Sequence, residues 1–258
     1  MRDWKGLYLS LKKLQKEVKP YQTDGSKKEQ VSRMFDNIAP KYDLLNKVLS
    51  MGTDRRWRKR AIGLLPTGRE SVLLDVATGT ADLAIEMIRQ GKAGRVVGVD
   101  IANEMLEFGR KKLKARNLDD RVELLFGDSE NLPFGGNTFD GMAVAFGVRN
   151  FENLSKGLAE MARVLKEGAT VVVLEFSKPR AFPFKQIYDA YFRYLLPLIG
   201  KITSKDPKAY RYLYESVQAF PEREDFLNEL SRAGFDQGRY FVLTLGICCI
   251  YVAKKKNK

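Results

Sequence analysis

Between residues 72 and 176, short apolar runs alternate with longer stretches in which apolar and polar positions follow helical spacing. Runs of this length suit strands buried on both faces, and the amphipathic stretches suit the helices that cover them. This alternation predicts a parallel sheet with right-handed crossovers, that is, a doubly wound, Rossmann-like α/β fold. The predicted strands are 72–77, 95–100, 122–126, 139–146 and 170–176, and the predicted helices are 82–89, 103–116 and about 153–166.

The N-terminal part follows a different pattern. Residues 4–18 place apolar side chains on one helical face and lysines on the other, and with a linker they form a basic extension over 1–28. The main domain is expected to span 29–258, and its first part, 29–65, predicts helices interrupted at Pro40 and Gly52. The extension either docks on the body of the protein, lies on a membrane surface, or frays.

The pattern changes again after the fifth strand. Residues 179–220 are rich in aromatic side chains at helical spacing, which predicts an inserted helical lid; ordinary core aromatics are the alternative. A helix at about 222–233 precedes two strands, 236–243 and 246–253, that predict a terminal hairpin. An exposed edge of that hairpin would suit a homodimer.

Charge and composition narrow the chemistry. The net charge is +13, and residues 1–60 hold 16 Lys and Arg against 7 Asp and Glu, so the excess is concentrated near the N-terminus. This excess indicates either an ordinary solvated surface or contact with an anionic partner, which would be lipid headgroups or nucleic acid. The chain has no histidine, which excludes a histidine base, and its two cysteines, Cys248 and Cys249, are neighbours in an apolar run. We therefore expect buried thiols, a reducing compartment and no metal site.

No apolar run reaches the roughly 18 residues that span a bilayer, and lysines interrupt the N-terminal segment where a signal peptide would need an apolar core. The expected location is the cytoplasm. If the basic extension lies on a membrane, the protein would contact the inner face of the plasma membrane peripherally.

The end of the first strand carries candidate binding residues, in LLDVATGTADLA (Leu73–Ala84). Gly79 allows a tight turn and close approach to a ligand, and Asp75 can accept hydrogen bonds from an ammonium group. Asp82 is placed to cap the next helix. It also stands at the third glycine position of G-x-G-x-x-G, where a carboxylate would repel a pyrophosphate, so a dinucleotide is disfavoured.

Acidic residues also end the next two strands. Asp100, 21 residues after Gly79, is placed to accept hydrogen bonds from a ribose diol. Asp128 and Ser129 follow the third strand, where a carboxylate can accept from the exocyclic amine of adenine; a turn-and-cap pair is the alternative. Carboxylates at three successive strand ends favour one binding site over three unrelated turns.

Five longer motifs are more specific than the turn after the first strand: MFDNIAPKYDLLNKVLS (34–50), LLDVATGTADLA (73–84), AFGVRN (145–150), RVLKEGATVVVLEFSKP (163–179) and YESVQAFP (214–221). Together they resemble the ubiquinone/menaquinone biosynthesis C-methyltransferase family. The resemblance runs from about Val18 to the C-terminus and departs from the family pattern at Leu45, Asp54, Ala145 and Glu167.

The resemblance implies a class I methyltransferase sheet of seven strands, the last one antiparallel. It implies S-adenosylmethionine as methyl donor, no metal, and the ring carbon of a prenylated quinol as acceptor. The family's donor-binding positions fall on Thr80, Asp100, Asp128 and Ser129.

Methyl transfer to a quinol ring requires an electron-rich carbon and a route for a proton. Arg149 and Asn150, at the end of the fourth strand, are predicted to face the acceptor, where Arg149 can stabilise a quinolate and Tyr42 can orient the ring. Arginine stays protonated, so water polarised by Arg149 and Asn150 is the expected proton acceptor. The alternative for Arg149 is a salt bridge within the fold. The aromatic lid is expected to hold the prenyl tail.

Other functions stay open at this point. We favour the naphthoquinol of the menaquinone branch, and the benzoquinol of the ubiquinone branch is the first alternative. An RNA methyltransferase fits the net charge, but no RNA-binding module is recognisable, so nucleic acid is not expected as a partner. A non-catalytic donor- or quinone-binding regulator is a third class, and the acidic strand ends argue against it.

Overall fold

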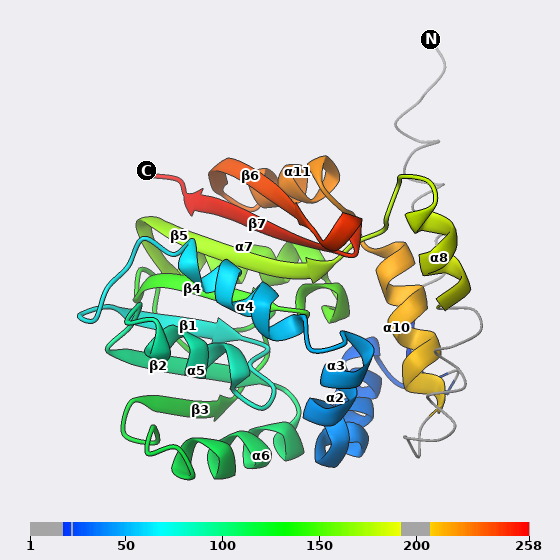
Figure 1. Ribbon diagram of the computed structural model, residues 1–258. Coiled ribbons are helices and arrows are strands. Elements are labelled where there is room, and N and C mark those ends of the chain that lie inside the picture. Colours follow the sequence, from blue (N-terminus) through cyan, green and yellow to red (C-terminus); the bar gives the residue numbers. More distant parts are fainter. Residues whose placement is uncertain (1–17, 22, 192–206, 258) are drawn as a thin grey trace.

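The computed structural model describes residues 18–21, 23–191 and 207–257, which contain a seven-stranded sheet covered by helices on both faces (Figure 1). The order is β3-β2-β1-β4-β5-β7-β6, parallel except that β7 runs antiparallel to β5 and to β6. The predicted fold, including its antiparallel last strand, is confirmed. The strands are β1 (Val72–Val76), β2 (Arg95–Asp100), β3 (Val122–Phe126), β4 (Phe139–Ala145), β5 (Leu165–Phe176), β6 (Phe235–Leu243) and β7 (Cys248–Lys255).

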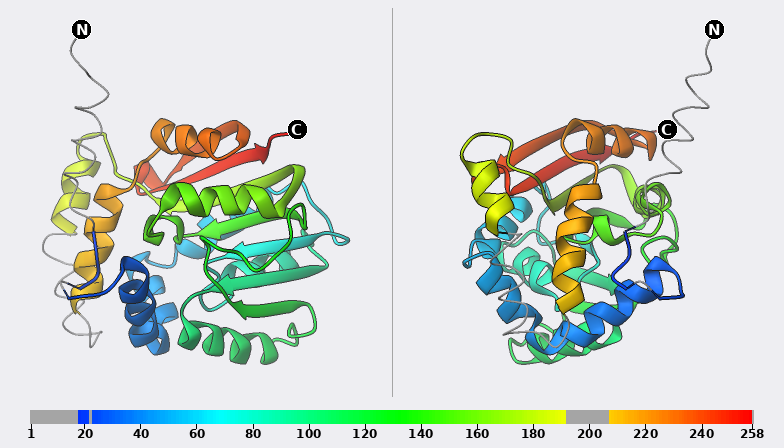
Figure 2. Two further views of the ribbon diagram at one scale, coloured as in Figure 1. Left: turned by 180° about the vertical axis from the view of Figure 1, so that it is seen from behind. Right: turned by 90° about the vertical axis from the view of Figure 1, so that its right-hand side faces the viewer.

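Successive side chains of each strand enter opposite layers of the core. Leu73 packs with α4 and α5, whereas Leu74 packs with α7 and α11, and all are buried in two separate apolar clusters. Seen from behind, α7 and α11 cover the second face (Figure 2). These helices are α4 (Asp54–Gly63), α5 (Asp82–Arg89), α7 (Leu154–Val164) and α11 (Glu224–Arg232); α6 (Asn103–Lys114) packs beside β3.

The sheet order reverses at β1, which pairs with β2 on one side and β4 on the other. Ligands of open α/β sheets bind at the carboxyl ends of strands near such a reversal. Figure 1 shows the tips of the parallel strands pointing toward a group of helices at one side. These are α2 (Lys27–Ile38), α3 (Tyr42–Leu49), α8 (Phe184–Ala190) and α10 (Pro207–Ala219), with the short helices η1 (Ala39–Lys41), η2 (Val148–Asn150) and η4 (Thr244–Gly246) in the adjoining loops.

Most element boundaries lie within two residues of the sequence prediction, and two of the differences have a clear physical cause. Helix α2 begins at Lys27, inside the expected linker, because the Ser26 side chain caps it and Glu29 completes a capping box. Strand β5 begins at Leu165 instead of 170, because Leu165 already pairs with Phe139 before an irregularity in the register.

The predicted lid and the predicted N-terminal helix lie only partly within the residues that the structure describes. The lid region contributes α8 and α10, while residues 192–206 lie outside the described residues, as does the predicted helix at 4–18 except for its last position. Strand β6 is an edge of the described sheet, and the homodimer stays a prediction. No helix of the described residues is both long and apolar enough to cross a bilayer.

Cys248 and Cys249 are free, fully buried thiols at the start of β7, as predicted. Because they are adjacent on one strand, Cys248 lies in the cluster with α4 and α5, and Cys249 lies in the cluster with α7 and α11. Burial raises the pKa of both thiols.

Candidate active site

Two adjoining cavities open where the parallel strands end. The strand-end cavity, of about 670 Å³ including its mouth, is lined by residues that follow β1, β2, β3 and β4 and by the inner face of α2. The aromatic cavity, of about 1590 Å³ including its mouth, lies among α2, α3, α4, α8, α10 and η4. Phe35, Tyr42 and Phe146 line both cavities, so these three rings form the wall between them.

The turn after β1 has an unusual backbone. Ala77, Gly79 and Ala81 have φ angles of 54°, 56° and 66°, in the left-handed region that strains residues other than glycine. The N–H of Gly79 donates to Oδ2 of Asp100 over 2.8 Å, which fixes the turn to the end of β2. A Cβ at Gly79 would lie 3.9 Å from a ring carbon of Tyr42, so the turn borders the wall between the cavities.

Asp100 lies at the end of β2 and lines the strand-end cavity, as predicted from the sequence. Its Oδ1 accepts from the N–H of Ala102 over 2.9 Å. Burial raises the pKa of Asp100 to about 6, against the opposing effect of the backbone N–H groups of Ala102, Gly79 and Ile101. At neutral pH the carboxylate is ionised and its orientation is fixed, which suits a ligand with paired hydroxyl donors.

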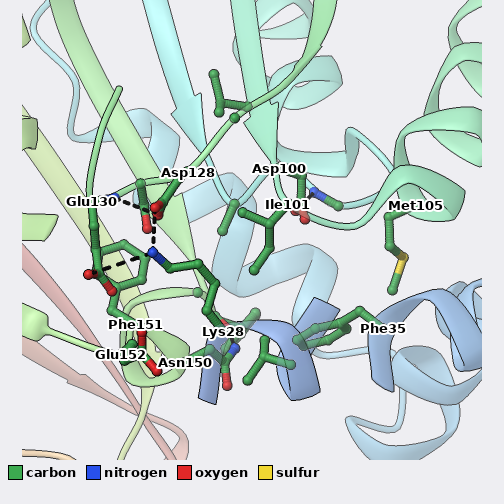
Figure 3. Close-up of a pocket in the computed structure, with 18 of the residues that line it drawn as sticks. Lys28, Phe35, Asp100, Ile101, Met105, Asp128, Glu130, Asn150, Phe151 and Glu152 are labelled. Atoms are coloured by element: carbon green, nitrogen blue, oxygen red, sulfur yellow. Dashed lines mark hydrogen bonds and ion pairs between the residues drawn. The ribbon is translucent and has the colours of Figure 1, made fainter. Parts of the chain in front are cut away.

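Asp128 and Ser129 line the opposite side of the same cavity. Figure 3 shows the side chain of Lys28 reaching from α2 to Asp128, with Glu130 beyond it. The Lys28 ammonium donates to Oδ2 of Asp128 and lies 3.9 Å from Glu130. The hydrogen bond to Asp128 raises the pKa of Lys28. Asp128 also caps its own turn, since Oδ1 accepts from the N–H of Glu130 over 2.9 Å, so the turn-and-cap interpretation holds alongside the cavity position.

Helix α2 is fastened to the loop after β4. The N–H of Lys27 donates to Glu152 over 2.7 Å, and its ammonium donates to the carbonyls of Arg149 and Phe151 over 3.2 and 2.7 Å. These contacts hold helix α2, which lines the strand-end cavity, against the loop that carries Arg149 and Asn150.

Asp75 lies outside both cavities. Its carboxylate is buried and accepts from the Thr78 hydroxyl over 2.6 Å and from the N–H of Ala84 over 3.1 Å. Burial raises the pKa of Asp75 to about 7. The side chain therefore braces the turn from below, and contact with an ammonium group stays a prediction.

Thr80 also lies behind the turn instead of on a cavity wall. Its hydroxyl donates to Asp43 over 2.6 Å and accepts from Lys112 over 2.9 Å. Lys112 also forms an ion pair with Asp82, and Arg58 forms a second ion pair with the same carboxylate; both distances are 2.8 Å. A donor-binding role for the Thr80 side chain stays a prediction.

The expected helix cap by Asp82 is wrong, because Ala81 is the N-cap and makes no side-chain hydrogen bond. The Asp82 carboxylate instead receives Arg58 and Lys112. Burial alone would raise the pKa of Asp82, and these two cations outweigh that effect and hold it below its usual value.

Arg149 lines the aromatic cavity at the end of β4 and forms the salt bridge that the sequence left as an alternative. Its Nη1 donates to Glu175 over 2.8 Å and to the Phe146 carbonyl over 2.5 Å, and the guanidinium lies 5.3 Å from the centre of the Phe176 ring. The Glu175 side chain is 0% exposed and that of Arg149 is 8% exposed. Burial raises the pKa of Glu175, while Arg149 acts in the opposite direction.

Two buried polar atoms beside this ion pair have no hydrogen-bond partner within the described part of the chain: Nε of Arg149 and Oδ1 of Asn150. Asn150 lines the strand-end cavity and donates from Nδ2 to the Phe146 carbonyl over 3.3 Å. A buried donor and a buried acceptor left open on consecutive residues match a ligand that carries a hydroxyl group or its anion.

Tyr42 stands between the two cavities and packs edge-on against Phe35, with ring centres 6.0 Å apart. Burial raises the pKa of Tyr42, against a hydrogen bond with Asn46 that lowers it. Its hydroxyl is therefore protonated at neutral pH, so the ring suits orientation of a ligand and does not serve as a base.

The structure thus gathers most predicted residues at one place. Tyr42, Gly79, Asp100, Asp128, Ser129, Arg149 and Asn150 line one or both cavities. The sequence analysis missed Lys28 and Glu175. Glu175 sits near the end of β5, so the rule that found Asp100 and Asp128 would have found it too. Within the described residues, no three His, Cys, Asp or Glu side chains gather as metal ligands would.

The sheet order, the turn after β1 and the strand-end carboxylates define the class I S-adenosylmethionine-dependent methyltransferases. Solved structures share the fold: the [4+2]-cyclase SpnF aligns with a TM-score of 0.65 at 18% identity, over 91% of this chain and 98% of that chain. A methyltransferase from Thermotoga maritima aligns with a TM-score of 0.63 at 18% identity, over 87% and 99%. At these identities the likeness shows the fold and not the reaction.

The chain belongs to the ubiE/COQ5 methyltransferase family, whose sequence profile matches residues 23–255. The protein is therefore an S-adenosylmethionine-dependent methyltransferase. A demethylmenaquinone methyltransferase of Bacteroides fragilis is 46% identical over 93% of this chain and 98% of its own length. One from Porphyromonas gingivalis is 43% identical over 92% and 98%. A ubiquinone/menaquinone biosynthesis C-methyltransferase of Citrifermentans bemidjiense is 46% identical over 89% and 97%.

Proposed function

We propose that this methyltransferase converts demethylmenaquinol to menaquinol by moving a methyl group from S-adenosylmethionine to a ring carbon. The names of the Bacteroides and Porphyromonas relatives support this acceptor. The observation that carries the proposal is the junction of the two cavities at Tyr42, beside the open Nε of Arg149 and Oδ1 of Asn150.

The donor would occupy the strand-end cavity and supply an electrophilic methyl group. The ionised Asp100 accepts hydrogen bonds from the ribose hydroxyls, and Asp128 with Ser129 binds the adenine edge. Lys28 must release Asp128 for that contact, which an ion pair about one-third exposed allows at a cost of about 1 kcal/mol or less. Asp75 and Thr80 contribute by bracing the turn that carries Gly79.

The acceptor ring would lie in the aromatic cavity against Tyr42. Arg149 donates from Nε to the quinolate oxygen and stabilises its charge, while Asn150 accepts from a hydroxyl or a water molecule. As the new carbon–carbon bond forms, the methyl–sulfur bond of the donor would break and leave its electron pair on sulfur, so that the donor departs as a neutral thioether. The ring carbon would then lose its proton to water, because the chain has no histidine and Arg149 stays protonated. The aromatic side chains of α8 and α10 enclose the start of the prenyl tail.

A prenylated acceptor resides in the bilayer, so the proposal includes peripheral contact with the membrane from the cytoplasmic side. The cytoplasmic location, the homodimer and the membrane role of residues 1–17 are further parts of the proposal.

The test is transfer of labelled methyl from S-adenosylmethionine to a short-tailed demethylnaphthoquinol, reduced in situ. A benzoquinol analogue and bulk RNA run in parallel. We expect label in the naphthoquinol. Equal label in the benzoquinol would extend the substrate class to the ubiquinone branch, to which the UbiE name of some relatives also refers. Label in RNA alone would overturn the proposal.

Arg149→Lys sharpens this test, because lysine keeps the charge but loses the Nε donor and the planar fork. We expect kcat to fall by about 10- to 100-fold, the loss of one charged hydrogen bond, with the dissociation constant of the donor within twofold of wild type. Arg163→Lys, on an exposed Glu160 pair, is the matched control. Unchanged kcat in Arg149→Lys would contradict the assigned role of the guanidinium.

A further inference from the structure

The mouth of the aromatic cavity carries exposed apolar side chains from three separate segments. Met51 follows α3, Phe184 and Ile187 belong to α8, and Leu245 belongs to η4; all four line this cavity. Their exposed fractions are 87%, 36%, 61% and 60%. We call these four residues the apolar rim. Phe182, just before α8, is 81% exposed as well.

Backbone strain holds two members of the rim outward. Met51 and Leu245 have φ angles of 50° and 57°, in the left-handed region that disfavours long apolar side chains. Such strain is retained where the surrounding structure imposes it, most often at functional positions. The left-handed backbone costs free energy, and an exposed apolar side chain offsets none of that cost by burial. The arrangement therefore indicates that these side chains contact something outside this chain.

The rim has basic neighbours. The Lys47 carbonyl accepts from the N–H of Gly52 over 2.8 Å, which places Lys47 beside the loop of Met51, and Arg55 and Arg56 follow within five residues. All three are exposed, and the structure gives them no acidic partner among the residues it describes. Residues 41–60 hold seven Lys and Arg against two Asp.

We propose that the apolar rim, with Lys47, Arg55 and Arg56 around it, is the surface that docks on an anionic lipid bilayer. Apolar side chains that enter the acyl boundary next to cations that meet headgroups are the two elements of interfacial binding. A second copy of the chain fits less well, because a symmetric contact would bring the basic residues of both copies together. The inference rests on the proposed lipid acceptor and adds how it arrives: the rim opens the aromatic cavity directly onto the membrane.

The test measures flotation of the full chain with vesicles of phosphatidylcholine containing about one-third phosphatidylglycerol, and with phosphatidylcholine alone. Met51→Asn with Leu245→Asn removes the apolar contact, and asparagine tolerates a left-handed backbone, so the fold is retained. We expect the partition coefficient on anionic vesicles to fall about tenfold or more, the scale of one to two buried apolar side chains. Val242→Asn, 45% exposed on β6 and away from both cavities, is the control.

Arg55→Gln with Arg56→Gln should weaken binding to the anionic vesicles about tenfold, with little effect on the neutral ones. Its control is Lys114→Gln with Arg116→Gln at the end of α6, and turnover of the short-tailed quinol by Arg55→Gln/Arg56→Gln should match wild type.

Vesicle binding that the rim variants leave unchanged overturns the proposal, as does binding lost only when residues 1–17 are deleted. A dimer that dissociates in Met51→Asn/Leu245→Asn also overturns it. Turnover of the soluble quinol by wild type tests the proposed function separately.

Discussion

The two cavities are built by different means. The strand-end cavity is formed mainly by loops that leave the sheet, and backbone N–H groups fix its Asp100 and Asp128 carboxylates. The aromatic cavity is enclosed mainly by helices outside the α/β core, and its only charged support from the sheet within the described residues is the Arg149–Glu175 pair. Under the proposed function, the constant donor would occupy the cavity whose carboxylates are fixed by backbone hydrogen bonds. The variable, apolar acceptor would occupy the cavity built from added helices.

Among the variants that test this contrast between the two cavities, Glu175→Gln should have the largest effect. It leaves the Arg149 guanidinium buried without its counter-charge, and breaking a buried pair costs about 3–5 kcal/mol of unfolding free energy. We also expect kcat to fall while the dissociation constant of the donor stays within a few-fold, because Glu175 positions Arg149 and lines neither cavity. Urea unfolding and calorimetric donor titration measure the two effects.

A merely structural role of Glu175 would lower stability and leave the kcat of the folded fraction unchanged. Glu160→Gln, which breaks the exposed pair with Arg163, is the matched control and should cost less than about 1 kcal/mol.

Asp100→Asn probes the other cavity. Exchanging an ionised acceptor for an amide should weaken donor binding by about 10- to 100-fold, the range for a hydrogen bond to a charged group. For wild type, the donor's dissociation constant should rise as the pH falls below about 6, the pKa of Asp100, and this pH dependence should vanish in the variant. The KM of the acceptor should change little. If the acceptor KM rose as much as the donor constant, the two cavities would not act as separate units.

Asp75→Asn should alter stability with little effect on either cavity, because asparagine keeps an oxygen that can accept from Thr78 and Ala84 and so still braces the turn. Because burial raises the pKa of Asp75 to about 7, the folded protein binds a proton that the unfolded chain has released between about pH 4 and 7. This group therefore stabilises the fold at low pH and loses that effect as the pH rises, with a slope of up to about 1.4 kcal/mol per pH unit. Denaturant midpoints at several pH values should show a flatter profile for the variant. Asp119→Asn, in the exposed loop before β3, should leave the slope of wild type.

How far the sequence predicts this site follows the same division. Asp100 and Asp128 were predictable because consecutive strands of a parallel sheet end at one edge, so that residues far apart in the chain must converge. Thr80 was predicted as a ligand-binding residue from resemblance alone. The structure turns its side chain toward Asp43 and Lys112, an orientation set by the left-handed turn that a sequence pattern does not specify.

For the aromatic cavity, the sequence predicted only that the residues around it would be apolar and aromatic. Aromatic residues in the lid indicated an apolar cavity, but which rings face Tyr42 depends on how α3, α8 and α10 pack, and several packing angles satisfy one amphipathic pattern. Lys28 was missed because the helix was expected to start at residue 29. The Ser26–Glu29 spacing was a readable capping signal, and it would have placed Lys28 in the first turn, close to the strand ends.

The adjacent thiols of β7 give each layer of the core its own reporter. Cys248 and Cys249 are chemically alike but lie on opposite sides of the sheet. A thiol reagent reaches a buried sulfur only when the structure around it opens, so the labelling rate measures the frequency of that opening. Labelling of Cys248→Ala and Cys249→Ala proteins, each with a single remaining thiol, therefore compares the fluctuations of the two layers without any added probe.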